Sequence, residues 1–361
     1  MKRFMLIAGL LMHIALTGCK GSDGTNGAAG TNGTNGTNGA SPPVYESEIL
    51  KAANHLVNTQ NSDGGWNWQI MPNSPVTPAL PSPYNTLGVS AQGVLDAYKV
   101  SPQAQYLNAC ENAYGLMVAN STNANPSVHR IRGTDITFLV ELSEVTGIAA
   151  YANFAKTRYE SALTEFGGGN AKGLATYVQG VRVGQGIPDI VAWDINLYVQ
   201  GALALNKYFP GQGFDADAAA MAGVIYTALY VSVPPAVTPV FDISSKPTGT
   251  PTNDYWLAVS GALEAFVTTA TYTTESTSLM TNLLTDQQQD GYFIGNGDNN
   301  QTTAYAVTAL VKAGNQIAAE KAVGYLLSTQ NTNGGWTEVD GYEYTETDSE
   351  INNAIVAGIT Y

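Results

Sequence analysis

The sequence predicts an all-α protein whose helices form an (α/α)6 toroid, a closed ring of six inner helices wrapped by six outer helices. Three observations lead to this prediction. Apolar residues recur with helical spacing from Glu46 onward, and no stretch alternates as a strand does. Long and short connectors alternate along the chain, and a corner of nearly the same sequence occurs near both ends. Stacked helical pairs that cannot bury their faces alone produce such regularity, and an open α-solenoid is the alternative arrangement.

The helical patterns divide into twelve segments that pair in chain order. Each segment carries recurring apolar positions, and turn-forming residues separate it from the next segment. The segments span residues 46–60, 84–99, 103–119, 133–146, 148–163, 190–208, 214–230, 254–269, 272–288, 301–313, 316–330 and 348–361.

The connectors between these segments indicate which helices line the ring. Only a few residues join each even-numbered segment to the next one. Because short links join antiparallel neighbours, the alternation places every long connector on one face of the ring. The even-numbered segments are then the inner helices, with their N-termini on that face. The long connectors span residues 61–83, 120–132, 164–189, 231–253, 289–300 and 331–347.

The repeated corner reads AANHLVNTQNSDGGW at 52–66 and KAVGYLLSTQNTNGGW at 321–336. Its glycines can adopt the positive φ that ends a helix and reverses the chain. We expect each glutamine to satisfy carbonyls in the last turn of its own helix, and each tryptophan to cover that amide. These structural residues are Gln60, Trp66, Gln330 and Trp336.

A fainter third copy, LLTDQQQDGYF at 283–293, has Gln287 at the glutamine position and Tyr292 near the tryptophan position. The pattern resembles the QW repeat of squalene–hopene and oxidosqualene cyclases, where it is scaffold, so the resemblance implies a fold rather than an activity. The Asp-x-Asp-Asp acid motif of squalene–hopene cyclases is missing. The zinc set of protein prenyltransferase β-subunits, which have a similar toroid, cannot form, because His55 and His129 have no cysteine partners. A Cys/His zinc site is therefore excluded, and no metal ligands are assigned.

The N-terminus predicts an exported lipoprotein. Lys2 and Arg3 precede an apolar run that ends in LTGC at Cys19, typical of a bacterial lipoprotein signal peptide. We expect residues 1–18 to be removed and Cys19 to be acylated, which anchors the chain in a lipid bilayer of the cell envelope, at the outer membrane or cell surface. An ordinary signal peptide is the alternative. Residues 19–44 then form a tether, and 45–361 form the toroid domain.

The tether contains seven Gly-x-y triplets from Gly21 to Ser41, a collagen-like pattern without proline. We favour a flexible linker over a trimerising stalk. Without residues 1–18 the chain has 13 basic and 29 acidic residues, a net charge of −16, which repels nucleic acid and anionic headgroups. Only Cys110 remains besides Cys19. It lies in the middle of a helical segment and is expected to be a small buried apolar residue.

Candidate functional residues concentrate on the face with the long connectors, where helix N-termini also favour anions. Only four arginines follow Cys19, and three of them lie on two successive long connectors. Arginine presents a planar fork suited to carboxylates, and tryptophan can stack on a sugar ring. The candidates for catalysis are Arg130, Arg132, Asp135, Arg182 and Asp194. The candidates for substrate binding are His129, Trp193, Asp254, Tyr255, Trp256 and Tyr305. The alternatives are that the aspartates cap helices, the indoles belong to the core and the arginines pair with acids.

Arginines, carboxylates and indoles on one face predict a glycan site. The stretch GTDITFLVELSEVTGIAAYANFAK at 133–156 is similar to pectate lyases with an α/α toroid. That resemblance implies β-elimination at a uronate, with an arginine neutralising the carboxylate and Ca²⁺ held by Asp135 or Asp194. Paired-carboxylate hydrolysis, using Asp135 with Asp194 or Asp254, is the variant. A toroid that binds a glycan without turnover, and a terpenoid cyclase-like enzyme on a hydrophobic substrate, remain as alternatives.

Overall fold

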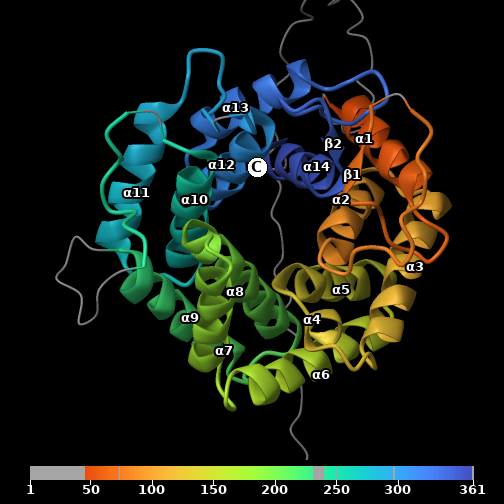
Figure 1. Ribbon diagram of the computed structural model, residues 1–361, viewed down its shortest axis with the longest axis horizontal. Coiled ribbons are helices and arrows are strands. Elements are labelled where there is room, and N and C mark those ends of the chain that lie inside the picture. Colours follow the sequence, from red (N-terminus) through yellow and green to blue (C-terminus); the bar gives the residue numbers. More distant parts are fainter. Residues whose placement is uncertain (1–44, 73, 231–239, 250, 296, 360–361) are drawn as a thin grey trace, which may run out of the picture. The chain divides into compact units, whose positions relative to one another are not determined.

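The computed structural model describes residues 45–72, 74–230, 240–249, 251–295 and 297–359, which belong to one unit of the chain. The predicted signal peptide, Cys19 and the Gly-x-y tether lie outside the described residues. Figure 1 shows the described helices arranged as a ring in two layers. The predicted all-α toroid is therefore confirmed.

Six helices form the inner layer, and each packs against the next until the last returns to the first. Their contacts run in chain order around the ring, and Figure 1 shows them surrounding the central axis. These inner helices are α2 (Leu87–Val100), α5 (Gly133–Thr146), α8 (Val191–Tyr208), α10 (Asn253–Thr268), α12 (Asn299–Lys312) and α14 (Thr345–Ile359).

Six further helices form the outer layer. The first of them packs on α2 and α14, and each of the others packs mainly on the inner helix that precedes it in the chain. An outer helix buries one stripe; in α1 this stripe consists of Ile49, Ala52, Ala53 and Leu56. The outer helices are α1 (Glu46–Thr59), α3 (Ala104–Asn120), α6 (Ala149–Phe166), α9 (Phe214–Leu229), α11 (Thr273–Asp286) and α13 (Gln316–Ser328).

Inner helices are enclosed on more sides, and small residues allow them to approach closely. In α10, every residue from Tyr255 to Phe266 is buried. A Cβ at Gly133 in α5 would lie 2.0 Å from the carbonyl carbon of Leu197 in α8. Glycine is thus required where these two helices meet. Cys110 is fully buried in α3, as expected of a small apolar residue.

The repeated corners share one hydrogen-bond pattern. The indole N–H of Trp66 donates to Leu56 O, and that of Trp336 donates to Leu326 O, each at 2.7 Å. The indole therefore satisfies the carbonyl in the last turn of its own helix, a role that the sequence analysis gave to the glutamine. Both tryptophans are 0% exposed.

The glutamine of each corner instead connects two repeats. Gln60 Nε2 donates to Gly64 O within its own corner and to Ala109 O in the next outer helix, both at 2.9 Å. Gln287 does the same with Gly291 O at 3.1 Å and Ala318 O at 2.8 Å. The corner is thus a joint between neighbouring repeats rather than a cap on one helix.

In the third corner, Phe293 takes the tryptophan position. It is 0% exposed and stands six residues after Gln287, the same spacing that separates Gln60 from Trp66. The adjacent Tyr292 packs against Tyr325 instead, with ring centroids 5.0 Å apart. Tyr292, predicted to lie near the tryptophan position, is thus the residue before it.

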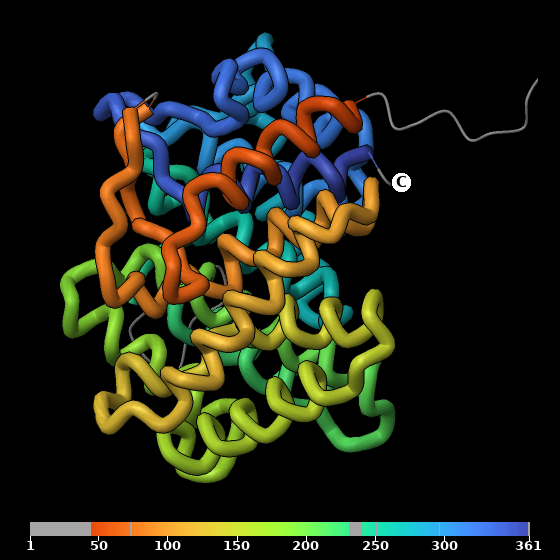
Figure 2. Tube along the Cα trace, turned by 90° about the vertical axis from the view of Figure 1, so that its right-hand side faces the viewer, coloured from red at the N-terminus to blue at the C-terminus, as the bar shows by residue number. Residues whose placement is uncertain are grey.

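The last corner closes the ring. Gln330 Nε2 donates to Gly334 O and to Glu48 O in α1, both at 3.0 Å. Figures 1 and 2 show α1 beside the C-terminal segments. Two short strands cross the same seam, since β1 (Gln69–Ile70) pairs antiparallel with β2 (Glu343–Tyr344). The first and last repeats are therefore neighbours, and the open solenoid is excluded.

The predicted connector 164–189 was wrong, because it contains a further helix, α7 (Ala171–Gly184), which packs against α8 and α9. Asn170 caps this helix by accepting from Gly173 N. A shorter helix, α4 (Pro126–His129), lies within the connector 120–132, and a 3₁₀ turn, η1 (Pro188–Ile190), precedes α8. Among the described residues, no helix has the length and apolar character needed to cross a membrane.

Candidate functional site

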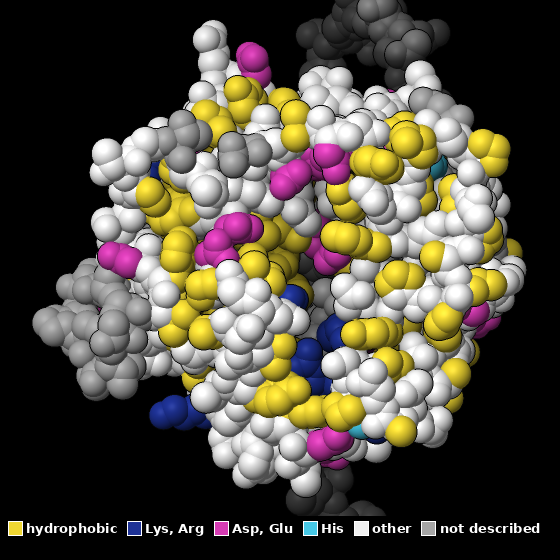
Figure 3. All heavy atoms as spheres, in the orientation of Figure 1, with side chains coloured by type: hydrophobic (Ala, Val, Ile, Leu, Met, Phe, Trp, Pro, Cys, Tyr) yellow, Lys and Arg dark blue, Asp and Glu magenta, His cyan; other side chains and the backbone are white. Residues whose placement is uncertain are grey.

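Two cavities of about 280 Å³ and 210 Å³ lie among the inner helices. The larger one, here called the outer chamber, is lined by the starts of the inner helices and by α7. The smaller one, the inner chamber, is lined by residues further along the same helices. Six residues line both chambers, which together form the axial cavity: Val89, Thr134, Trp193, Leu197, Tyr305 and Glu350. Figure 3 shows a central hollow with basic side chains gathered on one side and acidic side chains on the other.

All three arginines singled out from the sequence line the outer chamber. Arg130 and Arg132 come from the segment between α4 and α5, and Arg182 comes from the last turn of α7. The sequence placed Arg182 on an irregular connector, whereas a helix positions it. Arg132 and Arg182 thus face the same space, and the cavity has a basic wall.

Arg132 fixes the segment that carries it. Its guanidinium donates to Arg130 O at 2.9 Å and to Ser127 O at 2.7 Å, and lies 4.8 Å from the ring of Tyr84. Burial lowers the pKa of Arg132, although the nearby Asp135 acts in the opposite direction. Because these N–H groups donate to backbone carbonyls, the Arg132 side chain fixes the segment between α4 and α5.

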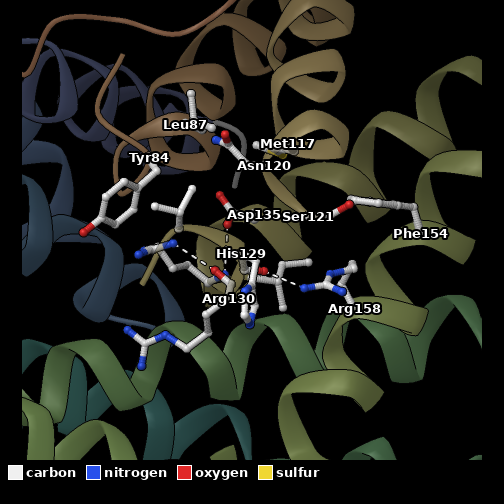
Figure 4. Close-up of a pocket in the computed structure, with 13 residues that line it drawn as sticks. Tyr84, Leu87, Met117, Asn120, Ser121, His129, Arg130, Asp135, Phe154 and Arg158 are labelled. Carbon is white, nitrogen blue, oxygen red and sulfur yellow. Dashed lines mark hydrogen bonds between the residues drawn. The ribbon is translucent and has the colours of Figure 1, made fainter. Parts of the chain in front are cut away.

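Asp135 also has a structural position. It is 6% exposed, and its two oxygens accept from Arg132 N at 2.9 Å and Gly88 N at 3.0 Å. Figure 4 shows Asp135 beside the segment of His129 and Arg130, with Tyr84 and Arg158 on opposite sides. A carboxylate that accepts two backbone N–H groups in this way is a helix-start contact, and both of its oxygens are already hydrogen-bonded within the protein.

Arg130 differs from Arg132 because two of its guanidinium nitrogens make no hydrogen bond to the described residues. Its guanidinium lies 5.8 Å from the Phe166 ring centroid and 5.3 Å from that of Tyr177. Its buried Nε and Nη1 have no hydrogen-bond partner among the described residues. A buried guanidinium with unpaired N–H groups is costly unless a ligand completes it, so Arg130 is suited to bind an anionic group.

Three carboxylates line the outer chamber together with the arginines. Arg182 Nε donates to Asp194 Oδ2, so this carboxylate has a cationic partner. Burial and the nearby Asp194 raise the pKa of Glu346 to about 7. Burial and the nearby Glu346 raise the pKa of Glu350 well above its ordinary value. The cavity therefore holds carboxyl groups that stay protonated near neutral pH next to one paired with arginine.

Glu346 and Glu350 were not among the candidates from the sequence. They stand one turn apart on α14, which begins at Thr345, three residues before the predicted start. Residues at i and i+4 share a helix face, so the spacing itself was the available signal. The predicted start at 348 placed Glu346 in a connector and hid the pair.

Two aromatic side chains form the boundary between the chambers. Trp193 from α8 and Tyr305 from α12 have ring centroids 3.7 Å apart, inclined at 37°. The Tyr305 hydroxyl donates to Glu350 Oε1 at 2.6 Å, which fixes the ring. Burial and Glu350 raise the Tyr305 pKa well above 10, so this phenol is a hydrogen-bond donor rather than a base.

The other candidates lie away from this boundary. Tyr255 and Trp256 are 1% and 0% exposed, so their rings belong to the core and have no face to offer a sugar. His129 lies on the outer side of its segment, where Nε2 contacts Glu165 at 2.8 Å. Burial and the neighbouring Asp189 raise the pKa of Asp254 to about 6, but neither residue lines the axial cavity.

This arrangement defines the class of the protein: an α/α toroid with a charged axial cavity. The sequence matches no protein-family model, and no curated protein sequence matches it. Solved structures share the fold along nearly the whole chain. A possible member of the GH105 family from Salmonella enterica superposes with a TM-score of 0.57 at 10% identity, covering 88% of this chain and 94% of that chain.

An inactive variant of the α-1,6-mannanase GH76A of Salegentibacter, in complex with α-1,6-mannotriose, gives a TM-score of 0.55 at 10% identity. It covers 87% of this chain and 99% of that chain. A variant of the type II terpene cyclase MstE from Scytonema, in complex with geranylgeranyl dihydroxybenzoate, gives 0.53 at 14% identity, covering 87% and 96%. At these identities the similarity shows the fold alone.

Proposed function

We propose that the axial cavity binds and hydrolyses a glycan that carries a carboxylate group. The observation that carries this proposal is the presence, in one chamber, of Arg130 with unpaired donors and of Glu346 beside Asp194. Arg130 binds the substrate carboxylate. The carboxyl pair supplies the acid and the base that glycosidic cleavage requires. The α-1,6-mannanase bound to mannotriose supports the proposal, since the same fold accommodates a glycan there.

The roles of Glu346 and Asp194 follow from the different surroundings of their carboxyl groups. Glu346 is protonated up to about pH 7 and donates its proton to the leaving glycosidic oxygen. Asp194, paired with Arg182, accepts a proton from the water whose oxygen bonds to the anomeric carbon. The glycosidic bond breaks and a hemiacetal forms, so atoms and charge balance. Trp193 provides the aromatic surface for a sugar ring at the chamber boundary.

The geometry disfavours the other two reactions. β-Elimination assisted by Ca²⁺ requires free carboxylate oxygens, whereas Asp135 is held by backbone N–H groups and Asp194 pairs with Arg182. A polyisoprene substrate favours a cavity without charges, whereas arginines, Asp194 and glutamates line the outer chamber, and glutamates and Lys312 line the inner one.

The test uses the full chain with neutral and uronate-containing polysaccharides. Reducing ends should increase without ultraviolet absorbance of unsaturated ends. Arg130→Ala should lower kcat/KM on the carboxylated substrate by about 10-fold to 100-fold, the value of a charge-assisted contact. Arg158→Ala is the matched control, because this arginine donates to His129 O and does not line the axial cavity. Unsaturated products would instead establish a lyase, and thermal stabilisation without products would establish a binding protein.

The predicted acylation of Cys19 bears on where this activity occurs. An anchored toroid would meet polysaccharides at the cell envelope, and the net charge of the chain disfavours nucleic acid as a partner. Labelling with a palmitate analogue, lost in Cys19→Ser, tests the anchor.

A further inference from the structure

A second cluster of chemically reactive side chains lies at the ring seam, outside the axial cavity. His55 belongs to α1, Glu343 to β2 and Asp348 to the first turn of α14. One ligand atom from each of these residues lies within 4.8 Å of the other two. The side chains are 10%, 0% and 1% exposed. Two buried carboxylates facing one imidazole are unusual, since buried charges need complete pairing.

The distances within the cluster match a metal coordination sphere. His55 Nε2 lies 3.0 Å from Glu343 Oε2 and 3.7 Å from Asp348 Oδ2. Donor atoms on a tetrahedron with metal–ligand bonds of about 2.0–2.2 Å are separated by roughly 3.3 Å. The two measured separations fall on either side of that value.

Two of the three converging atoms lack another partner in the described part of the chain, whereas Glu343 Oε2 also accepts from Asn333 Nδ2 at 3.1 Å. His55 Nε2 and Asp348 Oδ2 have no hydrogen-bond partner of acceptable geometry among the described residues. The opposite oxygen, Asp348 Oδ1, accepts from Trp336 N at 2.7 Å. That contact fixes the carboxylate so that its unpaired Oδ2 faces His55.

Two asparagine side chains orient Glu343, as the Trp336 N–H group orients Asp348. Asn331 Nδ2 donates to Glu343 Oε1 at 2.8 Å, and Asn333 Nδ2 donates to the same oxygen at 2.9 Å. Such outer contacts typically hold metal-binding carboxylates in place. Gly335 leaves room beside them, because a Cβ there would lie 2.9 Å from Glu343 Oε2 and 3.1 Å from Asp348 Oδ2.

A cavity of about 320 Å³ adjoins His55 and Glu343, and it shares no lining residue with the two chambers of the axial cavity. It gives an ion and a water molecule access from outside the ring. One imidazole with two carboxylates suits zinc and similar first-row divalent ions, whereas Ca²⁺ prefers oxygen ligands alone.

We propose that His55, Glu343 and Asp348 form a binding site for a divalent transition-metal ion of the zinc type, with a water molecule as the fourth ligand. The ion joins the first outer helix to the last inner helix and so fastens the ring at its seam. From the sequence no zinc site was expected, because the two histidines have no cysteine partners, and carboxylates were not considered as partners of His55. This inference is independent of the glycan hydrolysis proposed above.

The test is zinc binding by the full chain after treatment with EDTA. Titration calorimetry should show one zinc ion per chain, together with a rise in melting temperature that Ca²⁺ does not produce. Substitution of a ligand should weaken binding by about tenfold or more, as even outer-contact losses reach that range. The variants are His55→Gln and Asp348→Asn, and circular dichroism checks that both fold.

His129→Gln is the matched control, because His129 also contacts a carboxylate, but the pair joins α4 to Glu165 of α6 and includes no residue of the cluster. It should bind zinc like the wild type. Cobalt provides a second readout, since intense visible absorption reports a four-coordinate site with few waters. Absence of zinc uptake, or uptake that His55→Gln and Asp348→Asn leave unchanged, would overturn the proposal.

Discussion

The seam between the first and last repeats gives the sharpest test of the closed ring. Gln330→Ala removes two hydrogen bonds, to Glu48 O and Gly334 O. A hydrogen bond of this kind contributes about 0.5–1.5 kcal/mol net, so the expected loss is about 2 kcal/mol. The other atom of the amide, Oε1, has no hydrogen-bond partner among the described residues and adds nothing to the loss.

The chain offers two internal comparisons. Gln60 and Gln287 make the same pair of bonds, one within the corner and one to the next outer helix. In a closed ring, Gln287→Ala and Gln330→Ala should lower the free energy of unfolding by similar amounts, within about 1 kcal/mol. Gln60→Ala should cost at least as much, because Gln60 Oε1 also accepts from Asn112 Nδ2 at 3.3 Å. Ser328→Ala, at an exposed hydroxyl that bonds Tyr325 O, should change it by less than about 0.5 kcal/mol.

The assay is urea unfolding followed by circular dichroism and by tryptophan fluorescence, because Trp336 is buried in the same corner. If Gln330→Ala costs no more than Ser328→Ala while the two internal variants each cost about 2 kcal/mol, the seam is open in solution and the reasoning fails.

Three further predictions concern the acids and one glycine. Glu346→Gln should lower kcat by about 100-fold or more and abolish the decline in activity expected of the wild type as pH rises through about 7, measured as a pH–rate profile. Gly334→Ala should lower the melting temperature more than Gly168→Ala. Gly334 has φ +105° and a Cβ there would lie 2.3 Å from Lys51 O, whereas Gly168 at φ +58° has open space. Burial raises the pKa of Glu338 to about 8, so the folded state holds a proton that the unfolded state releases. Stability should therefore fall between about pH 4.5 and 8 in wild type and less in Glu338→Gln, measured by urea unfolding. Equal pH dependence in both proteins would contradict this assignment.

The ring was predictable because its signals are local. Helical periodicity located the twelve segments to within about three residues, and the alternation of connector lengths assigned them to two layers. The missed helix α7 contains Gly173, Gly180 and Gly184 and follows a run of three glycines. Glycine lowers helix propensity, so the sequence favours a loop there, whereas packing against α8 and α9 stabilises the helix.

The two sites were less predictable because the residues that form each of them lie far apart in the sequence. Arginine scarcity pointed to Arg130 and Arg182, but nothing local distinguishes the unpaired guanidinium of Arg130 from the committed one of Arg132. That distinction depends on tertiary contacts. His55 and Asp348 meet only because the ring closes, and a pattern read along the sequence contains no such information.

The charged residues of the cavity come from parts of the chain that are far apart, so the complete set assembles only when the ring closes. The basic wall comes from Arg130, Arg132 and Arg182, in the second and third repeats, whereas Glu346 and Glu350 are supplied by the final helix. A chain shortened by proteolysis or incomplete synthesis would retain an anion-binding surface without its proton donors. The glycan hydrolysis proposed above therefore requires that the last repeat has joined the first.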